Sequence, residues 1–293
     1  LKDAEQQKKR EELLKELAKY DSYKPEPLPV ALTIDDAASV APPTRIPKKS
    51  SSPTIEPGFL TILDEGPAAI LPSDKGTTGR RTTLATWLTR PDHPLTTRVI
   101  VNRIWQYHFG RGLVNTPADF GSMGERPSHP ELLDWLARDF VSGGWRLKRL
   151  HRLIVTSTAY RQTSLRDERQ VQLDPESRLY GRATMRRLDA ETLRDRILAT
   201  SGVLSSRMFG AAVPVKEDAV GQVVVGIDPP AGGEPPRGHE AFRRSIYVQV
   251  RRSQPLAMLQ VFDAPVMETN CDRRVSSTVA TQSLMLLNSE FVL

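Results

Sequence analysis

The sequence has little of the chemistry on which disulfide scaffolds, thiolate metal sites and attached haem depend. It holds one cysteine in 293 residues, Cys271. One thiol excludes an internal disulfide, a multi-thiolate zinc site and the CxxCH motif that attaches haem covalently. Nor does any uninterrupted apolar run approach the roughly 18 residues that a membrane-spanning helix requires. We therefore expect no cofactor in this chain and no membrane-spanning segment.

Familiar catalytic motifs are also missing. There is no HExxH or HxxxH pair, and His108, His129 and His151 are too far apart in sequence for their spacing to indicate a metal site. No serine lies in a GxSxG elbow, and no glycine-rich stretch matches GxGxxG or a P-loop. The sequence thus predicts no metal and gives no support to a serine hydrolase or a nucleotide-binding enzyme.

The basic surplus is confined to one part of an otherwise ordinary composition. The chain is 39% hydrophobic with a formal net charge of +6. Residues 80–200 hold twenty arginines and one lysine against thirteen acidic residues. Because guanidinium groups suit fixed carboxylate or phosphate partners, this block either forms internal ion pairs or presents a surface to an anionic ligand.

Proline and charge patterns divide the chain into three parts. Residues 1–20 form a solvated helix with a short leucine stripe, which we interpret as the end of a preceding region. Ten of the 23 prolines lie in the segment 21–79, which predicts a long extended arm. The chain starts with Leu1 and stops inside an amphipathic pattern, so we expect a fragment of a longer protein that is truncated at its C-terminus.

Residues 80–293 have the periodicity of a mainly helical domain. Leu84, Trp87 and Leu88 indicate a short buried helix, and Ser128 with Glu131 indicates a capping box. Further helices are expected at 94–109, within the segment 128–144 that Gly143 and Gly144 terminate, and at 147–158 and 189–199, with another start at Asp174. A β-containing part is expected at about 210–255, where 221–227 and 243–252 would pair as a hairpin. The predicted fold is mainly α, a helical bundle-like domain with a small hairpin or sheet in its C-terminal third and a long extended N-terminal arm.

Several blocks of this region resemble one known family. They are PDHPLTTRVIVNRIWQYHFGRGLVNTPADFGSMGERPSHPELLDWLARDFVSGGW and its continuation to residue 164, MRRLDAETLRDRILATSG, RRSIYVQVRR, VFDAP and TVATQSLMLLNSEFV. Over roughly residues 55–293 the chain resembles the PSD-type domain of unknown function that accompanies planctomycete cytochrome c domains. The resemblance implies export to the periplasm or cell surface, and a haem-binding cytochrome c domain upstream in the same polypeptide. It implies no activity, and the family usually has Asn where this chain has His93.

Polar residues of the helical block form two candidate sites. Asn102 and Arg103 lie mid-helix beside apolar neighbours, and the following glycine-rich loop is dense in ligand-type side chains. Such groups either build a polar site or form a hydrogen-bond clamp that joins the helix to the loop of Asp119. The candidate polar cluster is Asn102, Arg103, His108, Asp119, Glu125, His129 and Arg161. A candidate anion-binding strip follows Trp145 and consists of Arg146, Lys148, Arg149 and Arg152.

The sequence leaves three functions open. The first is a binding or structural module that supports the upstream domains of the same polypeptide. The second is an enzyme acting on extracellular, anionic or sulfated polysaccharide, for which Asp119, His129 and Arg161 are the residues to test. The third is a docking partner in haem-based electron transfer. Nucleic acid is disfavoured as a partner because acids are interleaved with the arginines and no recognised binding motif is present.

Overall fold

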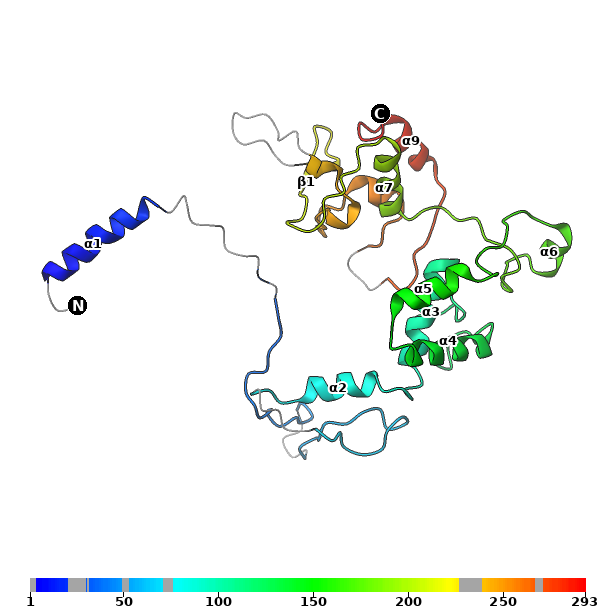
Figure 1. Cartoon of the computed structure of the whole chain (residues 1–293), viewed down its shortest axis with the longest axis horizontal. Helices are drawn as coiled ribbons and strands as arrows, with labels where there is room; N and C mark the ends of the chain where they lie inside the picture. Colours follow the sequence, from blue (N-terminus) through cyan, green and yellow to red (C-terminus); the bar gives the residue numbers. More distant parts are fainter. Residues whose placement is uncertain are drawn as a thin grey trace. The chain divides into compact units, whose positions relative to one another are not determined.

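The computed structural model describes residues 4–20, 30, 32–48, 53–70, 76–226, 239–266 and 271–293. The chain divides into two compact units, Leu1–Thr89 and Arg90–Leu293, and each is described by itself. The regular structure of the described residues is mainly helical, with one small two-stranded sheet (Figure 1). The expected mainly helical fold with a small sheet in the C-terminal third and an extended arm is confirmed.

In the first unit, the proline-rich arm packs against one helix. After α1 (Ala4–Ala18), the described residues from 30 to 70 contain isolated bridges and turns but no helix. In α2 (Arg80–Leu88), Trp87 stacks on Phe59 with ring centroids 4.5 Å apart and donates from Nε1 to Asp64 at 2.7 Å. The expected burial of α2 is wrong: no residue of this helix is buried, because the arm covers it chiefly at Trp87. Parts of the arm, including residues 21–29 and 71–75, lie outside the described residues.

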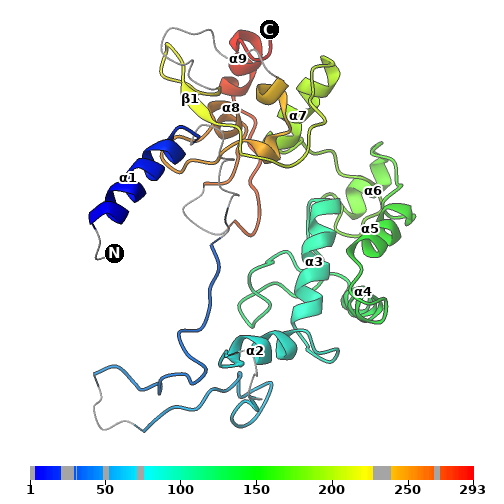
Figure 2. The same ribbon diagram turned by 60° about the vertical axis from the view of Figure 1, so that its left-hand side comes forward.

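Three helices of the second unit enclose its largest hydrophobic core. They are α3 (Thr96–Phe109), α4 (Pro130–Ser142) and α5 (Leu147–Thr156), which lie together in Figure 2. Their apolar stripes have the three-to-four spacing expected from the sequence, so one face of each helix is buried. The core consists of Val101, Ile104, Trp105, Leu113, Val114, Leu133, Leu136, Phe140, Leu150 and Ile154.

A histidine precedes the first turn of both α3 and α4. His93 is buried, and its Nδ1 accepts the backbone N–H groups of Leu95 and Thr96 at 3.2 and 3.1 Å. It thereby satisfies donors that a helix N-terminus leaves free, the role in which asparagine is favoured. The expected capping box at Ser128 is wrong. Pro130 occupies the first turn of α4, so His129 takes the N-cap position and the Ser128 hydroxyl donates to the Leu113 carbonyl instead.

The helix expected to start at Asp174 is also wrong. The chain forms α6 (Glu168–Leu173) just before this point, capped by the Asp167 carboxylate. Asp174 ends that helix, and its carboxylate accepts the backbone N–H groups of Arg178 and Leu179 at 2.8 and 2.7 Å. A short aspartate side chain that bonds to following amides forms a turn rather than a helix start. The next helix, α7 (Ala190–Thr200), follows Asp189 as expected.

The sheet pairs strands other than those expected. β1 (Val215–Glu217) and β2 (Val223–Val225) form an antiparallel hairpin in which Val215 pairs with Val225. Asp218 accepts the amides of Val220 and Gln222, which closes a tight turn between the strands. This local turn brings β2 to β1. Residues 243–252 instead form η3 (Ser245–Tyr247) and two parallel bridges, from Arg243 to Ser205 and from Val248 to Val213. Residues 227–238, within the expected β-containing part, lie outside the described residues.

Two buried arginines bind the C-terminal loops to α7. Arg194 and Arg243 are each 1% exposed. Arg194 donates to the carbonyls of Arg243 and Ala241, and Arg243 donates to the Ala211 carbonyl at 3.1 Å. The remaining elements are η2 (His239–Phe242), α8 (Ala257–Val261) and α9 (Ala280–Asn288). Because buried guanidinium groups need several acceptors, these arginines organise backbone and are not available to a ligand.

Candidate functional site

Asn102 is a structural clamp. Its side chain is fully buried, its Nδ2 donates to the Val114 carbonyl at 2.9 Å, and its Oδ1 accepts the Val114 N–H at 2.8 Å. Gly112 allows this close approach: a Cβ there would lie 2.4 Å from the Val114 carbonyl oxygen. The clamp interpretation of Asn102 is therefore confirmed, with Val114 as the bonded residue of the loop that also contains Asp119.

The other members of the polar cluster are not bonded to one another around a common point. Asp119 accepts the N–H of Gly121 at 2.7 Å, and His129 Nδ1 lies 3.0 Å from the Ser128 hydroxyl. Arg161 is exposed and Arg103 is partly buried. Within the described part of the chain, no hydrogen bond or ion pair joins any two of the residues Asn102, Arg103, Asp119, His129 and Arg161.

His108 forms a pair with a residue outside the predicted cluster. Its Nε2 lies 2.7 Å from Nδ1 of His151, so α3 and α5 are joined by one ring that donates and one that accepts. The pKa of His108 lies below its usual range because the ring is desolvated, and the nearby His151 and Arg186 add to this effect. Among the residues that the structure describes, no group of three or more His, Cys, Asp or Glu side chains could hold a metal ion.

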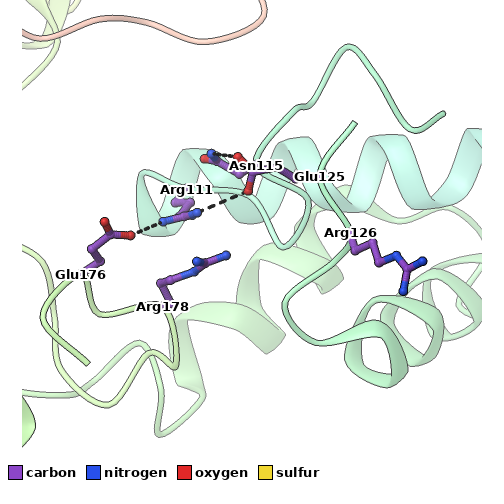
Figure 3. Close-up of a pocket in the computed structure, with 6 residues that line it drawn as sticks. All are labelled: Arg111, Asn115, Glu125, Arg126, Glu176 and Arg178. Atoms are coloured by element: carbon purple, nitrogen blue, oxygen red, sulfur yellow. Dashed lines mark hydrogen bonds and ion pairs between the residues drawn. The ribbon is translucent and has the colours of Figure 1, made fainter. Parts of the chain in front are cut away.

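Glu125 does line a cavity, an open polar hollow of about 910 Å³ that we call the Arg111 depression (Figure 3). Arg111 pairs with both glutamates of the lining, with its guanidinium 3.5 Å from Glu125 and 3.4 Å from Glu176. Asn115 donates to Glu125 at 2.9 Å. All the lining residues are polar or charged: Arg111, Asn115, Glu125, Arg126, Glu176 and Arg178.

Three segments of the chain supply this depression. Arg111 follows Gly110, whose left-handed φ of 80° ends α3. Glu125 comes from the loop before α4. Glu176 and Arg178 come from the turn that Asp174 closes after α6. The sequence signals for these positions were the helix-ending glycine and the Asp-Pro turn. Nothing in the sequence indicated that residues 65 positions apart, Arg111 and Glu176, would form an ion pair.

The charges of the depression are unevenly satisfied. The pKa of Glu125 lies below its usual range, chiefly because Asn115 donates to the carboxylate and also because Arg111 and Arg178 are close to it. Both glutamates face Arg111, whereas Arg126 and Arg178 are exposed and their guanidinium groups have no hydrogen bond or ion pair to another described residue. Two arginines are thus available to an incoming anion.

Comparison with known proteins places this site within a family. The model of the PSD1 family, described as a protein of unknown function (DUF1553), matches residues 80–293. The chain belongs to this family. The PSD1 region starts at the first residue of α2 and contains every residue of the depression. No curated protein and no solved structure matches the chain.

Much of the arginine surplus of the PSD1 region is used internally. In the predicted anion-binding strip, Arg149 is held by both carboxylate oxygens of Asp139 at 2.6 and 2.7 Å. Arg98 and Arg187 each pair with one carboxylate oxygen, of Asp134 and of Asp263 respectively. The internal-pairing interpretation is confirmed for these arginines. Arg146, Lys148 and Arg152, the rest of the strip, are exposed.

The helices in the described part of the chain lack the combination of length and apolar character that crossing a bilayer demands. The Arg111 depression is open to solvent and lined by polar and charged side chains. Such a hollow is suited to holding a charged group by hydrogen bonds from guanidinium nitrogens.

Proposed function

We propose that this chain is part of an exported binding module whose Arg111 depression holds the carboxylate or sulfate groups of an extracellular polysaccharide. The observation that supports the proposal is the presence of Arg126 and Arg178 in an open hollow whose two glutamates already face Arg111. A guanidinium binds carboxylate and sulfate through two parallel N–H donors, and an open hollow admits one part of a long polymer.

Binding fits the electrostatics of this site better than glycoside hydrolysis. A hydrolytic pair needs one carboxyl group with a raised pKa that can donate a proton to the leaving group. The pKa of Glu125 lies below its usual range, which is the opposite of the shift that a proton donor needs. Glu125 and Glu176 are instead placed to hold Arg111 in position.

The test is a titration of the full chain with polygalacturonate and with dextran sulfate, using neutral dextran as the control polymer. We expect binding to the two anionic polymers, and weaker binding as the ionic strength rises, because salt screens exposed charges. Arg178→Glu should weaken binding by about tenfold or more, which corresponds to about 1.4 kcal/mol.

Arg152→Glu is the matched control. It makes the same change of charge at an exposed position of α5, in the predicted strip and away from the depression. Its affinity should stay within about twofold of the unmodified chain, since a remote exposed charge contributes little to a specific contact. Equal losses from both variants would show a diffuse electrostatic attraction, and no binding to either anionic polymer would refute the proposal.

The proposal includes export and an upstream cytochrome c domain, as the family resemblance implies. Support comes from the resemblance in sequence alone, and this chain itself holds no haem-attachment motif. The full-length gene tests this part directly. We expect it to encode a signal peptide and a CxxCH motif upstream of Leu1, and a full-length gene without them would contradict this part of the proposal.

A further inference from the structure

A second cavity, of about 690 Å³, lies in the C-terminal part of the second unit. It shares no residue with the Arg111 depression, and its size is within the roughly 300–1,000 Å³ usual for small-molecule sites. Its walls come from α7, η3, α8 and the segments that follow η3 and α8. The residues that matter to a ligand are the aliphatic side chains Ile246, Val248, Val250, Leu256, Leu259 and Val266, and the charged side chains Glu191, Asp195, Arg244, Arg251 and Arg252.

The apolar part of this cavity has a buried floor and an exposed rim. Val248 and Leu256 are 7% and 8% exposed and belong to the core beneath the sheet. Ile246, Val250 and Val266 are 77%, 65% and 70% exposed. These large aliphatic side chains surround the cavity and remain exposed to water. A ligand that covers them would gain about 25 cal/mol of binding free energy per Å² of apolar area buried.

The acidic side chains of the cavity already have partners. Glu191 is held by both terminal nitrogens of Arg274, at 2.5 and 2.9 Å. Asp195 accepts the backbone N–H of Ser245 at 2.6 Å and its hydroxyl at 2.7 Å. These bonds leave the carboxylates committed to the protein.

The arginines of the cavity form fewer hydrogen bonds and ion pairs with the described residues than its carboxylates do. Among the residues that the structure describes, the Arg251 side chain donates once, to Gln254 at 3.2 Å. Arg244 lies 3.4 Å from Asp195, and its side chain is 62% exposed. Arg252 is exposed and has no hydrogen bond or ion pair to any other residue that the structure describes. The cavity therefore joins an aliphatic floor to a rim at which positive charge is available.

We infer that this cavity binds a small aliphatic carboxylate, with its hydrocarbon chain on Val248, Val250 and Leu256 and its carboxylate at Arg251 and Arg252. The described lining contains no aromatic ring, which favours a flexible hydrocarbon chain over a stacked aromatic ligand. The carboxylate matches the fork of donors that a guanidinium presents. This ligand is of a different class from the polymer proposed for the Arg111 depression.

The test is isothermal titration of the full chain with decanoate, decanol and acetate, each below its aggregation concentration. Decanoate should bind at least about tenfold more tightly than either of the others, because decanol lacks the charge and acetate lacks the hydrocarbon chain. Absence of decanoate binding, or equal binding of decanol, would overturn the inference.

Two variants, each with a matched control, test whether decanoate binds in this cavity. Val250→Asp places a charge on the exposed apolar rim, and Arg252→Glu reverses the charge beside it. Both should weaken decanoate binding by about tenfold or more. The matched controls are Val220→Asp, at a position 77% exposed in the turn between β1 and β2, and Arg196→Glu, on the exposed face of α7; both should bind as the unmodified chain does. Decanoate binding that survives Val250→Asp and Arg252→Glu, or that falls equally in the controls, would overturn the assignment to this cavity.

Discussion

Replacement of Asn102 by alanine should destabilise the second unit far more than its single amide suggests. The side chain makes two hydrogen bonds to one residue, the N–H and the carbonyl of Val114, inside the largest hydrophobic core. Val114 is 2% exposed, so water cannot replace the lost partner without opening the core. Asn102→Ala therefore removes both bonds and leaves two backbone groups of Val114 buried without partners.

The size of the effect follows from these two groups. A buried hydrogen bond contributes about 0.5–1.5 kcal/mol net, and a buried polar group left without a partner costs about 1–3 kcal/mol. With some relaxation of the loop, we expect a loss of about 2–4 kcal/mol in the free energy of unfolding. That is a large fraction of the roughly 5–15 kcal/mol that is typical of a folded domain.

Urea unfolding followed by circular dichroism measures the loss, and amide hydrogen exchange at Val114 reports the loop directly. Asn115→Ala is the matched control, because Asn115 lies on the same loop but is only partly buried and bonds to exposed Glu125 and Arg273. The control should cost less than about 1 kcal/mol. If Asn102→Ala costs no more than Asn115→Ala, or leaves Val114 exchange unchanged, the clamp is not what holds this loop.

Three further predictions concern packing and pH. Gly112→Ala should destabilise the folded chain by about 1–3 kcal/mol, since the new Cβ would lie 2.4 Å from the Val114 carbonyl oxygen. Gly181→Ala is the control and should not destabilise it, because a Cβ there has no atom within 4 Å. Thermal melts compare the two variants. The pKa of Asp263 is lowered from 3.8 to about 2, chiefly by the Ser277 backbone N–H, so its stabilisation is complete above pH 3.8 and is lost as the pH falls towards about 2. Asp263→Asn should remove that part of the acid dependence, and an unchanged acid unfolding curve would contradict this assignment. Because the pKa of His108 lies below 6.5, the folded state binds a proton at this ring less readily than the unfolded state does. Stability should therefore decline as the pH falls through 6.5, and His108→Gln should make the melting temperature less dependent on pH over that range. An equally steep decline in the variant would refute the assignment to His108.

Predictions from the sequence were most accurate where the determining interactions are local. The stripe of Leu133, Leu136 and Phe140 and the glycines that follow predicted α4 almost to its ends, because apolar spacing and helix-ending residues act within a few positions. The sequence did not identify the N-cap residue of the same helix correctly. Ser128 and Glu131 matched a capping box, but Pro130 moved the N-cap to His129, so the competing local signal decided the outcome.

Predictions failed where the outcome depended on contacts between segments that are separated in the sequence. The alternating pattern of residues 243–252 is typical of a strand, yet β2 pairs with β1, which a turn of few residues brings to it. A short loop has the smaller entropy cost of closure, and pattern alone does not measure that cost. The same limitation applied to the site: Glu125 was recognised as a candidate, but Arg111, Glu176 and Arg178 were not, because only the tertiary structure brings these separate segments together.

Composition and periodicity alone determined that this chain is mainly helical, that its arm is extended and that its basic surplus is almost pure arginine within residues 80–200. They also exclude the CxxCH haem-attachment motif from this sequence, since it holds one cysteine. Only the tertiary structure decided what each arginine does. Arg149, Arg187 and Arg194 donate to acceptors within the protein, whereas Arg178 and Arg252 line open cavities. The physical reason is that the availability of a charge to a ligand depends on which acceptors the fold brings within hydrogen-bonding distance, and those acceptors are mostly remote in sequence.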